Sequence, residues 1–229
     1  MVLLDAMENK TASVEICDRI REDIVSGALP FGSRLTLHRL ATRYLAGHMP
    51  VREALRQLQG EGLVVQTPNC GARVRAVDVD FVRNIFDLRI AIESMLARRA
   101  AERIKPKHVA ALQTVEADLE ACIAARDFAG ALTSNRAFHR IINEAAGNPE
   151  ASALLDRHWR LIAALWNVYG YGEERAAGVI SDHQQLIKAF ATHDTDVAAC
   201  LAMAHAAKAK QELIARMLRQ PAAVSEAAA

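Results

Sequence analysis

The chain has few cysteines and no long apolar run. Its four cysteines (Cys17, Cys70, Cys122 and Cys200) are scattered along 229 residues without a CxxC pair, which fits a reducing compartment better than a disulfide framework. No uninterrupted apolar stretch reaches the roughly eighteen residues of a membrane-spanning helix. The apolar run at residues 2–4 is too short for a secretory signal. These absences predict a cytoplasmic protein that does not associate with a membrane.

Net charge is also low, at +1, but it is unevenly distributed. Residues 34–75 contain seven arginines against two glutamates, a net charge of +5, which leaves −4 for the rest of the chain. A basic patch on a nearly neutral protein is what a phosphate-binding module requires. A solvated charged face explains the charge alone equally well.

The periodicity of residues 10–77 predicts three helices followed by a β-hairpin. The expected helices begin near Thr11, Thr36 and Pro50, with Thr36 as an N-cap and Pro50 in a first turn. Residues 63–67 are strand-like, residues 68–71 indicate a turn, and small or apolar residues alternate with Arg73 and Arg75 through residues 72–77. Three helices followed by a hairpin form a winged helix-turn-helix, a DNA-binding domain.

Residues 80–219 read as helical throughout, so the fold class is mostly α. Phe81, Ile85, Leu88, Ile92 and Met95 follow each other at spacings of four and three, which indicates a long amphipathic helix. Further apolar stripes predict an all-α bundle, and the Ala-rich tail at 220–229 is expected to be disordered.

Several motifs make the sequence resemble a known family. The N-terminal ones are Gly32-Ser-Arg-Leu35, Pro50-Val-Arg-Glu-Ala-Leu55, Glu61-Gly-Leu-Val64 and Gly71-Ala-Arg-Val74; the later ones are Leu88-Arg89, Glu93, Phe138-His139, Gly147-Asn148, His183 and His205. The first set resembles the winged helix of GntR transcription regulators, and the second resembles the FCD ligand-binding domain of the FadR-type branch. The resemblance implies a DNA-binding regulator and not an enzyme.

The resemblance places the DNA contacts on the second and third helices and the wing. They are His38, Arg39, His48, Arg52, Arg56, Gly71 and Arg73. Arg52 lies in the first turn of the third helix, where its guanidinium can reach guanine edges or phosphates in the major groove. An ion pair of Arg52 with an acid of the same domain is the structural alternative.

The chain departs from the family pattern at several DNA-facing positions. Gly47, His48 and Met49 stand where the family usually has Ser-Arg-Thr, and His38 stands where it usually has arginine. Histidine is mostly neutral near pH 7 and lacks the bidentate fork of arginine. We therefore expect an operator unlike the family's usual one, with affinity that rises as pH falls.

Four residues of the helical domain are candidate metal ligands. Asn135 and His139 are four residues apart on one helix face, while His183 and His205 belong to two later helices. By spacing alone, ordinary core or surface histidines explain these positions better. The FCD resemblance implies a divalent metal site, with zinc or nickel favoured over manganese by three imidazoles. The neutral amide of Asn135 is expected to bind a cation more weakly than a carboxylate.

The family resemblance also implies a small organic acid as effector, held by the metal. Arg89 is the candidate for a second carboxylate contact, with a buried Arg89–Glu93 ion pair as the structural alternative. The expected assembly is a homodimer on a palindromic operator, most simply as a repressor. Two alternatives remain open. One is a metal-dependent hydrolase at the same site, although no HExxH run supplies a base; the other is a sensor that has lost DNA specificity.

Overall fold

The computed structural model describes residues 2–67, 71–171 and 173–220, with only the backbone described for residues 2–11, 67 and 173–174. Residues 68–70 of the predicted turn at 68–71, and residues 221–229 of the predicted tail at 220–229, lie outside the described residues. The chain divides into two units. The first runs up to Asp78 and includes Arg160–Val168, which are part of helix α7 (Pro149–Tyr169); the second consists of Val79–Trp159 and Tyr169–Gln220. Each unit is described separately.

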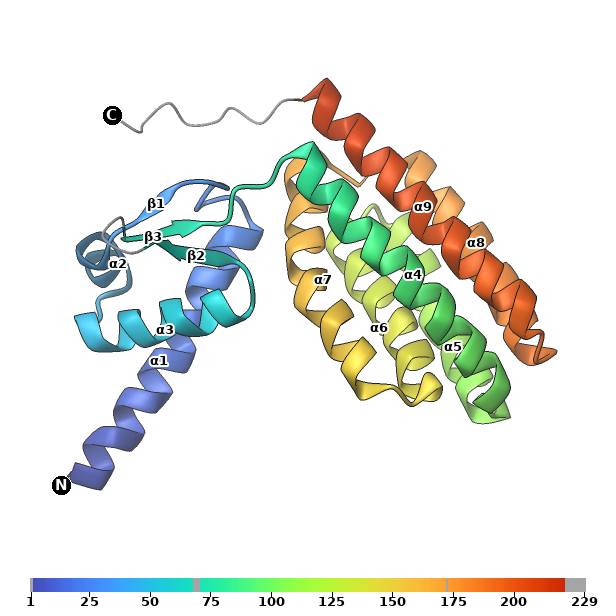
Figure 1. Cartoon of the computed structure of the whole chain (residues 1–229), viewed down its shortest axis with the longest axis horizontal. Helices are drawn as coiled ribbons and strands as arrows, with labels where there is room; N and C mark the ends of the chain where they lie inside the picture. Colours follow the sequence, from blue (N-terminus) through green and yellow to red (C-terminus); the bar gives the residue numbers. More distant parts are fainter. Residues whose placement is uncertain (1, 68–70, 172, 221–229) are drawn as a thin grey trace. The chain divides into compact units, whose positions relative to one another are not determined.

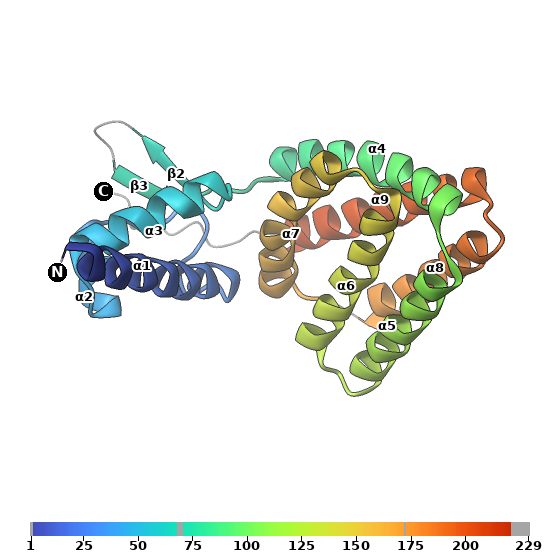
Figure 2. The same ribbon diagram turned by 90° about the horizontal axis from the view of Figure 1, so that it is seen from below.

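The N-terminal unit contains the predicted helices and hairpin. Its elements are α1 (Val2–Val25), β1 (Arg34–Leu35), α2 (Leu37–Tyr44), α3 (His48–Gly60), β2 (Val64–Thr67) and β3 (Gly71–Val74). The strands form one antiparallel sheet in the order β1-β3-β2, in which Arg73 of β3 faces Arg34 and Val65. Helix α3 packs across α1, as Figure 1 and Figure 2 show. The mostly α fold with an N-terminal winged helix-turn-helix is confirmed.

Local signals explain where α2 begins and ends. The Thr36 hydroxyl accepts a hydrogen bond from the Arg39 amide at 3.3 Å, as its predicted role as N-cap requires. The helix ends at Tyr44, and the residue that follows, the C-cap Leu45, has φ of 53° and is 93% exposed. Two details differ from expectation: α1 begins at Val2 and not near Thr11, and β1 is too short to produce a periodic signal.

The second unit is the predicted all-α bundle. Its helices are α4 (Val79–Arg103), α5 (Pro106–Ala124), α6 (Phe128–Ala146), α7 (Pro149–Tyr169), α8 (Glu173–Ala191) and α9 (Thr195–Arg219). In Figure 1, α9 runs beside α4 over most of its length. The core is built from apolar residues of several helices, among them Leu96, Phe138, Leu186 and Phe190. Among the described residues, no helix is long and apolar enough to cross a membrane.

Candidate DNA-binding surface and metal centre

Helix α3 presents a buried apolar face to its own unit and a polar face to solvent. Val51, Leu55 and Leu58 are almost completely buried, while Arg52 and Arg56 are exposed one turn apart. Because the buried positions anchor the helix, the two arginines are held outward on a rigid element. This is the arrangement that a recognition helix requires.

The other predicted DNA contacts are also exposed. His38 and Arg39 lie on α2, His48 on the first turn of α3, and Gly71 and Arg73 on β3. Arg73 donates a hydrogen bond from Nη1 to the Gly32 carbonyl oxygen at 3.2 Å, which connects the wing to the loop before β1.

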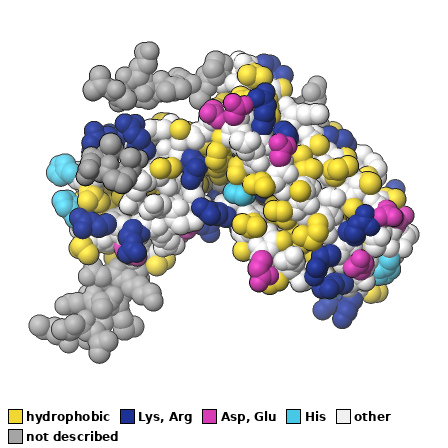
Figure 3. Space-filling model, in the orientation of Figure 1, with side chains coloured by type: hydrophobic (Ala, Val, Ile, Leu, Met, Phe, Trp, Pro, Cys, Tyr) yellow, Lys and Arg dark blue, Asp and Glu magenta, His cyan; other side chains and the backbone are white. Residues whose placement is uncertain are grey.

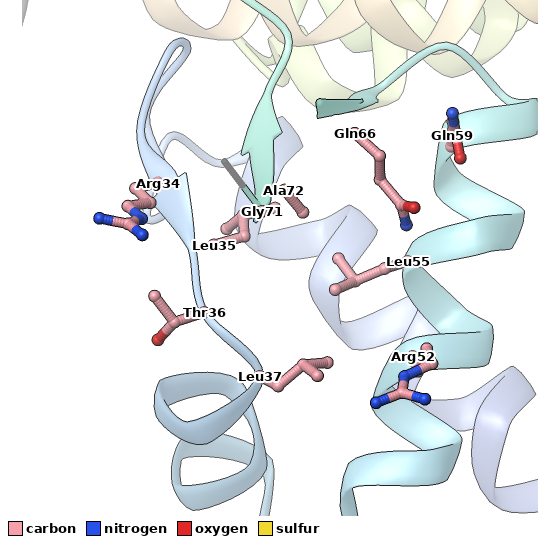
Figure 4. Close-up of a pocket in the computed structure, with 10 residues that line it drawn as sticks. All are labelled: Arg34, Leu35, Thr36, Leu37, Arg52, Leu55, Gln59, Gln66, Gly71 and Ala72. Atoms are coloured by element: carbon pink, nitrogen blue, oxygen red, sulfur yellow. The ribbon is translucent and has the colours of Figure 1, made fainter. Parts of the chain in front are cut away.

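Arg52 borders a groove of about 680 Å³ between α3 and the sheet. Figure 4 shows Gln66 of β2 and Leu55 of α3 projecting toward this groove, with Arg52 one turn before Leu55 on the same helix. The residues lining it include Arg34 and Gln59, so its rim is basic and polar while Leu35, Leu37 and Leu55 make an apolar floor. Within the part of the chain that the structure describes, Arg52 forms no ion pair, unlike Arg56, which lies 3.3 Å from Glu53. The alternative in which Arg52 serves an internal pair is therefore not supported.

Three predicted metal ligands converge inside the helical unit. His139 of α6, His183 of α8 and His205 of α9 each present a ring nitrogen, and these atoms lie within 4.8 Å of one another. His183 and His205 are buried, with ring centroids 5.1 Å apart, and Phe138 stacks on His183 at 3.8 Å. The bundle therefore fixes three imidazoles around one point.

Carboxylates behind two of the rings orient them. His183 Nδ1 lies 2.7 Å from Glu116 Oε2, and His205 Nδ1 lies 3.2 Å from Asp182 Oδ2. In the tautomer that donates Nδ1–H to an ionised carboxylate, the Nε2 atoms of His183 and His205 have a lone pair for a cation, as in carboxylate–histidine–metal arrangements. The buried Nε2 of His183 has no hydrogen-bond partner among the described residues.

Burial keeps these imidazoles neutral. It lowers the pKa of His183 and of His205 to about 3, and it also lowers the pKa of His139. Burial would raise the pKa of Asp182, but hydrogen bonds from His205 and Lys208 lower it to about 2. Burial, together with the nearby charge of Glu120, raises the pKa of Glu116 to about 8. Neutral imidazole is the form that binds a metal ion.

Asn135 completes the predicted ligand set. It is buried on α6, one turn before His139, and its Oδ1 has no hydrogen-bond partner among the described residues. A buried amide oxygen without a partner is costly, and a cation bound beside it would remove that cost. The three imidazole nitrogens fit a divalent transition metal, and the amide oxygen of Asn135 would serve as its fourth ligand.

Arg89 forms a buried ion pair and also lines a cavity next to the metal centre. Its Nη2 is 2.5 Å from Glu93 Oε1, with both side chains under 10% exposed, so the buried ion pair is present. Its guanidinium carbon also lies 5.9 Å from the Trp159 ring. Arg89 and His139 both line a cavity of about 110 Å³ that Arg136 and Arg140 border as well. Arg89 can therefore be paired with Glu93 and line the cavity at the same time.

Several residues of these sites were not predicted. Glu116 lies on α5, far from His183 in the sequence, and no local pattern marks it. Asp182 directly precedes His183, so its position offered a signal. Arg34 belongs to the basic segment, while Gln59 and Gln66 carry no charge that would have singled them out.

A winged helix-turn-helix with an exposed basic recognition helix, joined to a helical domain that holds a polar cavity, defines a DNA-binding transcription regulator. Residues 12–74 match the bacterial regulatory proteins of the gntR family, and residues 84–208, more than half of the chain, match the FCD domain. The chain belongs to the GntR family of bacterial regulators and carries an FCD domain.

Individual relatives agree with this assignment. The HTH-type transcriptional repressor GlaR of Escherichia coli K12 is 28% identical over 194 residues, which cover 81% of this chain and 88% of that protein. A probable D-xylose utilization operon transcriptional repressor of Paenarthrobacter nicotinovorans is 29% identical and covers 69% of this chain and 70% of its own length. The structure of E. coli McbR/YncC superposes with a TM-score of 0.73 at 21% identity, over 92% of this chain and 99% of that one, which supports the fold. The two sequence relatives are described as transcriptional repressors and not as enzymes, so the hydrolase alternative is set aside.

Proposed function

We propose that the protein is a cytoplasmic homodimer that represses transcription from a palindromic operator, and that a small carboxylate bound at a divalent metal controls its DNA affinity. The repressor role is supported by the names of the two relatives, both described as repressors. The metal-centred control is supported by the convergence of three imidazole nitrogens and the unpartnered Asn135 oxygen.

The metal would be held by Asn135, His139, His183 and His205. Three imidazole nitrogens favour zinc or nickel over manganese. When bound, the cation supplies a buried positive charge that attracts the carboxylate of the effector. The ligand positions are fixed by packing and by Glu116 and Asp182, so the site is formed before the metal binds.

The effector would enter the cavity beside His139. Three arginines (Arg89, Arg136 and Arg140) and two acids (Glu144 and Asp156) line this cavity, and the acids lie close to Arg140 and Arg136 respectively. The net positive charge of the lining favours an anion, and the cavity volume of about 110 Å³ favours a small acid. An effector carboxylate that binds Nη2 of Arg89 would have to displace Glu93, with which this nitrogen is paired. The effector carboxylate therefore competes with Glu93 for the same guanidinium.

On the DNA side, Arg52 and Arg56 are proposed to read the major groove. Gly71 and Arg73 would place the wing beside the neighbouring groove, and the other predicted contacts, His38, Arg39 and His48, would touch phosphates or base edges. Effector binding then changes operator affinity by the difference in its affinity for the two arrangements of the dimer, typically about 1–3 kcal/mol.

The metal part is tested by measuring metal content and thermal unfolding. The protein, stripped with a chelator and reloaded with zinc or nickel, should bind one ion per chain and unfold at a higher temperature. The variant His139→Ala should do neither. Small carboxylic acids should raise the unfolding temperature of the loaded protein further, whereas the matching neutral alcohols and D-xylose should not. Loss of all these effects in the wild type would refute metal-centred control while leaving DNA binding intact.

A further inference from the structure

Helix α4 buries Leu96 and its neighbours in the bundle core, with Ile92 packed against that core, but it also carries apolar side chains that the core does not cover. Leu88 is 54% exposed and Met95 is 36% exposed. The same helix buries the charged pair Arg89 and Glu93 on another face. An amphipathic helix of a soluble protein usually buries its apolar stripe. Here part of that stripe is left for a partner outside the bundle.

Helix α9 extends this surface. Asp196, Met203 and Lys210 are seven residues apart, so they lie on one stripe of α9. Asp196 pairs with Arg98 and Lys210 pairs with Asp87, which places that stripe along the edge of α4. Met203, 45% exposed, lies between the two ion pairs.

These residues define one surface, which we call the α4–α9 face. It consists of Leu88, Ala91, Met95 and Met203, with the ion pairs Lys210–Asp87 and Arg98–Asp196 at its two ends. Figure 3 shows hydrophobic side chains gathered over these two helices, with charged side chains around them. An apolar centre with a polar rim is the usual composition of a protein–protein interface.

We infer that a second copy of this chain covers the α4–α9 face, with the two α4 helices antiparallel. The charges support this choice. In that arrangement, Asp87 lies opposite the second copy's Arg98, and Lys210 lies opposite the second copy's Asp196. A two-fold contact requires such self-complementarity, because each surface meets its own copy. The seven-residue spacing of Leu88 and Met95 also suits packing between two long helices.

The inference rests on the proposed homodimer and specifies its surface. It also explains how the effector site could influence the dimer. Arg89 and Glu93 lie on the buried face of α4, and Leu88 and Met95 lie on its exposed face, so one helix would carry both the effector contact and the dimer contact.

The test is sedimentation velocity on the full chain with matched variants. Leu88→Lys and Met95→Lys each place an unpaired charge in the apolar centre, so each should weaken the dimer by at least about tenfold, or ~1.4 kcal/mol. Leu154→Lys is the control, because Leu154 is 49% exposed on α7 and lies outside the face. All of these positions are exposed, so helicity measured by circular dichroism should be unchanged.

A charge-pair rescue tests the antiparallel register. The double variant Leu88→Lys with Met95→Glu should regain the dimer, because each lysine then lies near a glutamate of the second copy. The double variant Leu88→Lys with Met95→Lys should not regain the dimer, because lysines then lie near each other across the contact. A dimeric wild type whose single variants remain fully dimeric would overturn the assigned surface and leave the homodimer standing. Weakened single variants without rescue would overturn the antiparallel register. A wild type that is monomeric at all concentrations would overturn the homodimer itself and assign the face to another protein.

Discussion

The ion pair between Arg89 and Glu93 offers a quantitative test of the structure. The two charged groups are 2.5 Å apart, and the side chains are 7% and 8% exposed. Replacing Arg89 with methionine keeps an unbranched chain of similar reach but leaves the Glu93 carboxylate buried without its cation. Removing one partner of a buried pair typically costs about 3–5 kcal/mol, a large share of the ~5–15 kcal/mol that stabilises a folded protein.

A double-mutant cycle separates this cost from loss of packing. Urea unfolding followed by far-ultraviolet circular dichroism should show a free energy of unfolding about 3–5 kcal/mol lower for Arg89→Met. Glu93→Gln should cost less, because Arg89 retains its contact with the Trp159 ring. The double variant should be close to the wild type, since no unpaired charge remains.

A cost below about 1 kcal/mol for Arg89→Met would show that Glu93 is solvated, and it would refute the buried pair on which the effector competition depends. The double variant also tests whether the Arg89 guanidinium contacts the effector carboxylate. Because it should fold, any loss of stabilisation by carboxylates can be attributed to the missing guanidinium and not to unfolding.

Three further predictions concern other parts of the chain. Burial lowers the pKa of His205 to about 3, below the unfolded value of about 6.5, so the unfolded chain gains the extra proton as pH falls and stability is lost from about pH 6.5 downward. The metal-free wild type should therefore lose about 2 kcal/mol more than His205→Gln between pH 7 and pH 5, as measured by urea unfolding; equal losses would contradict the burial of this imidazole. His48→Arg should tighten operator binding by about 1–3 kcal/mol in fluorescence anisotropy, with His48→Gln as the neutral control, and wild-type affinity should rise from pH 8 to pH 6. Flat affinity over that range would remove the histidines from the DNA contact. Leu45→Gly should raise the free energy of unfolding by up to about 1 kcal/mol, because Leu45 has a φ of 53° and an exposed side chain; a loss of stability would mean that the left-handed conformation carries no strain there.

The sequence predicts the elements better than it predicts their partners. Thr36 as a cap, the break before α3 and the hairpin were readable because each depends on neighbours in the chain. The convergence of His139, His183 and His205 depends on how three helices pack, so spacing alone did not favour a metal site, and only the family resemblance pointed to it. Glu116 was missed for the same reason.

Helix α4 shows a second kind of limit. The spacing of Ile85, Leu88, Ile92 and Met95 correctly indicated a long amphipathic helix. It could not show that Leu88 is exposed while Arg89 is buried, because periodicity does not specify what covers an apolar stripe. The choice between the bundle's own core and a partner chain is made by tertiary packing.

The most direct test of the central claim is selection of DNA fragments from the source genome by the purified protein at moderate salt, followed by sequencing. A DNA-binding regulator with a specific operator should enrich a few sites that share a short palindrome, and Arg52→Ala should abolish that enrichment. Enrichment of nothing beyond a salt-sensitive background would contradict specific operator recognition. It would instead support a sensor in which the changes at Gly47, His48 and Met49 have removed DNA specificity.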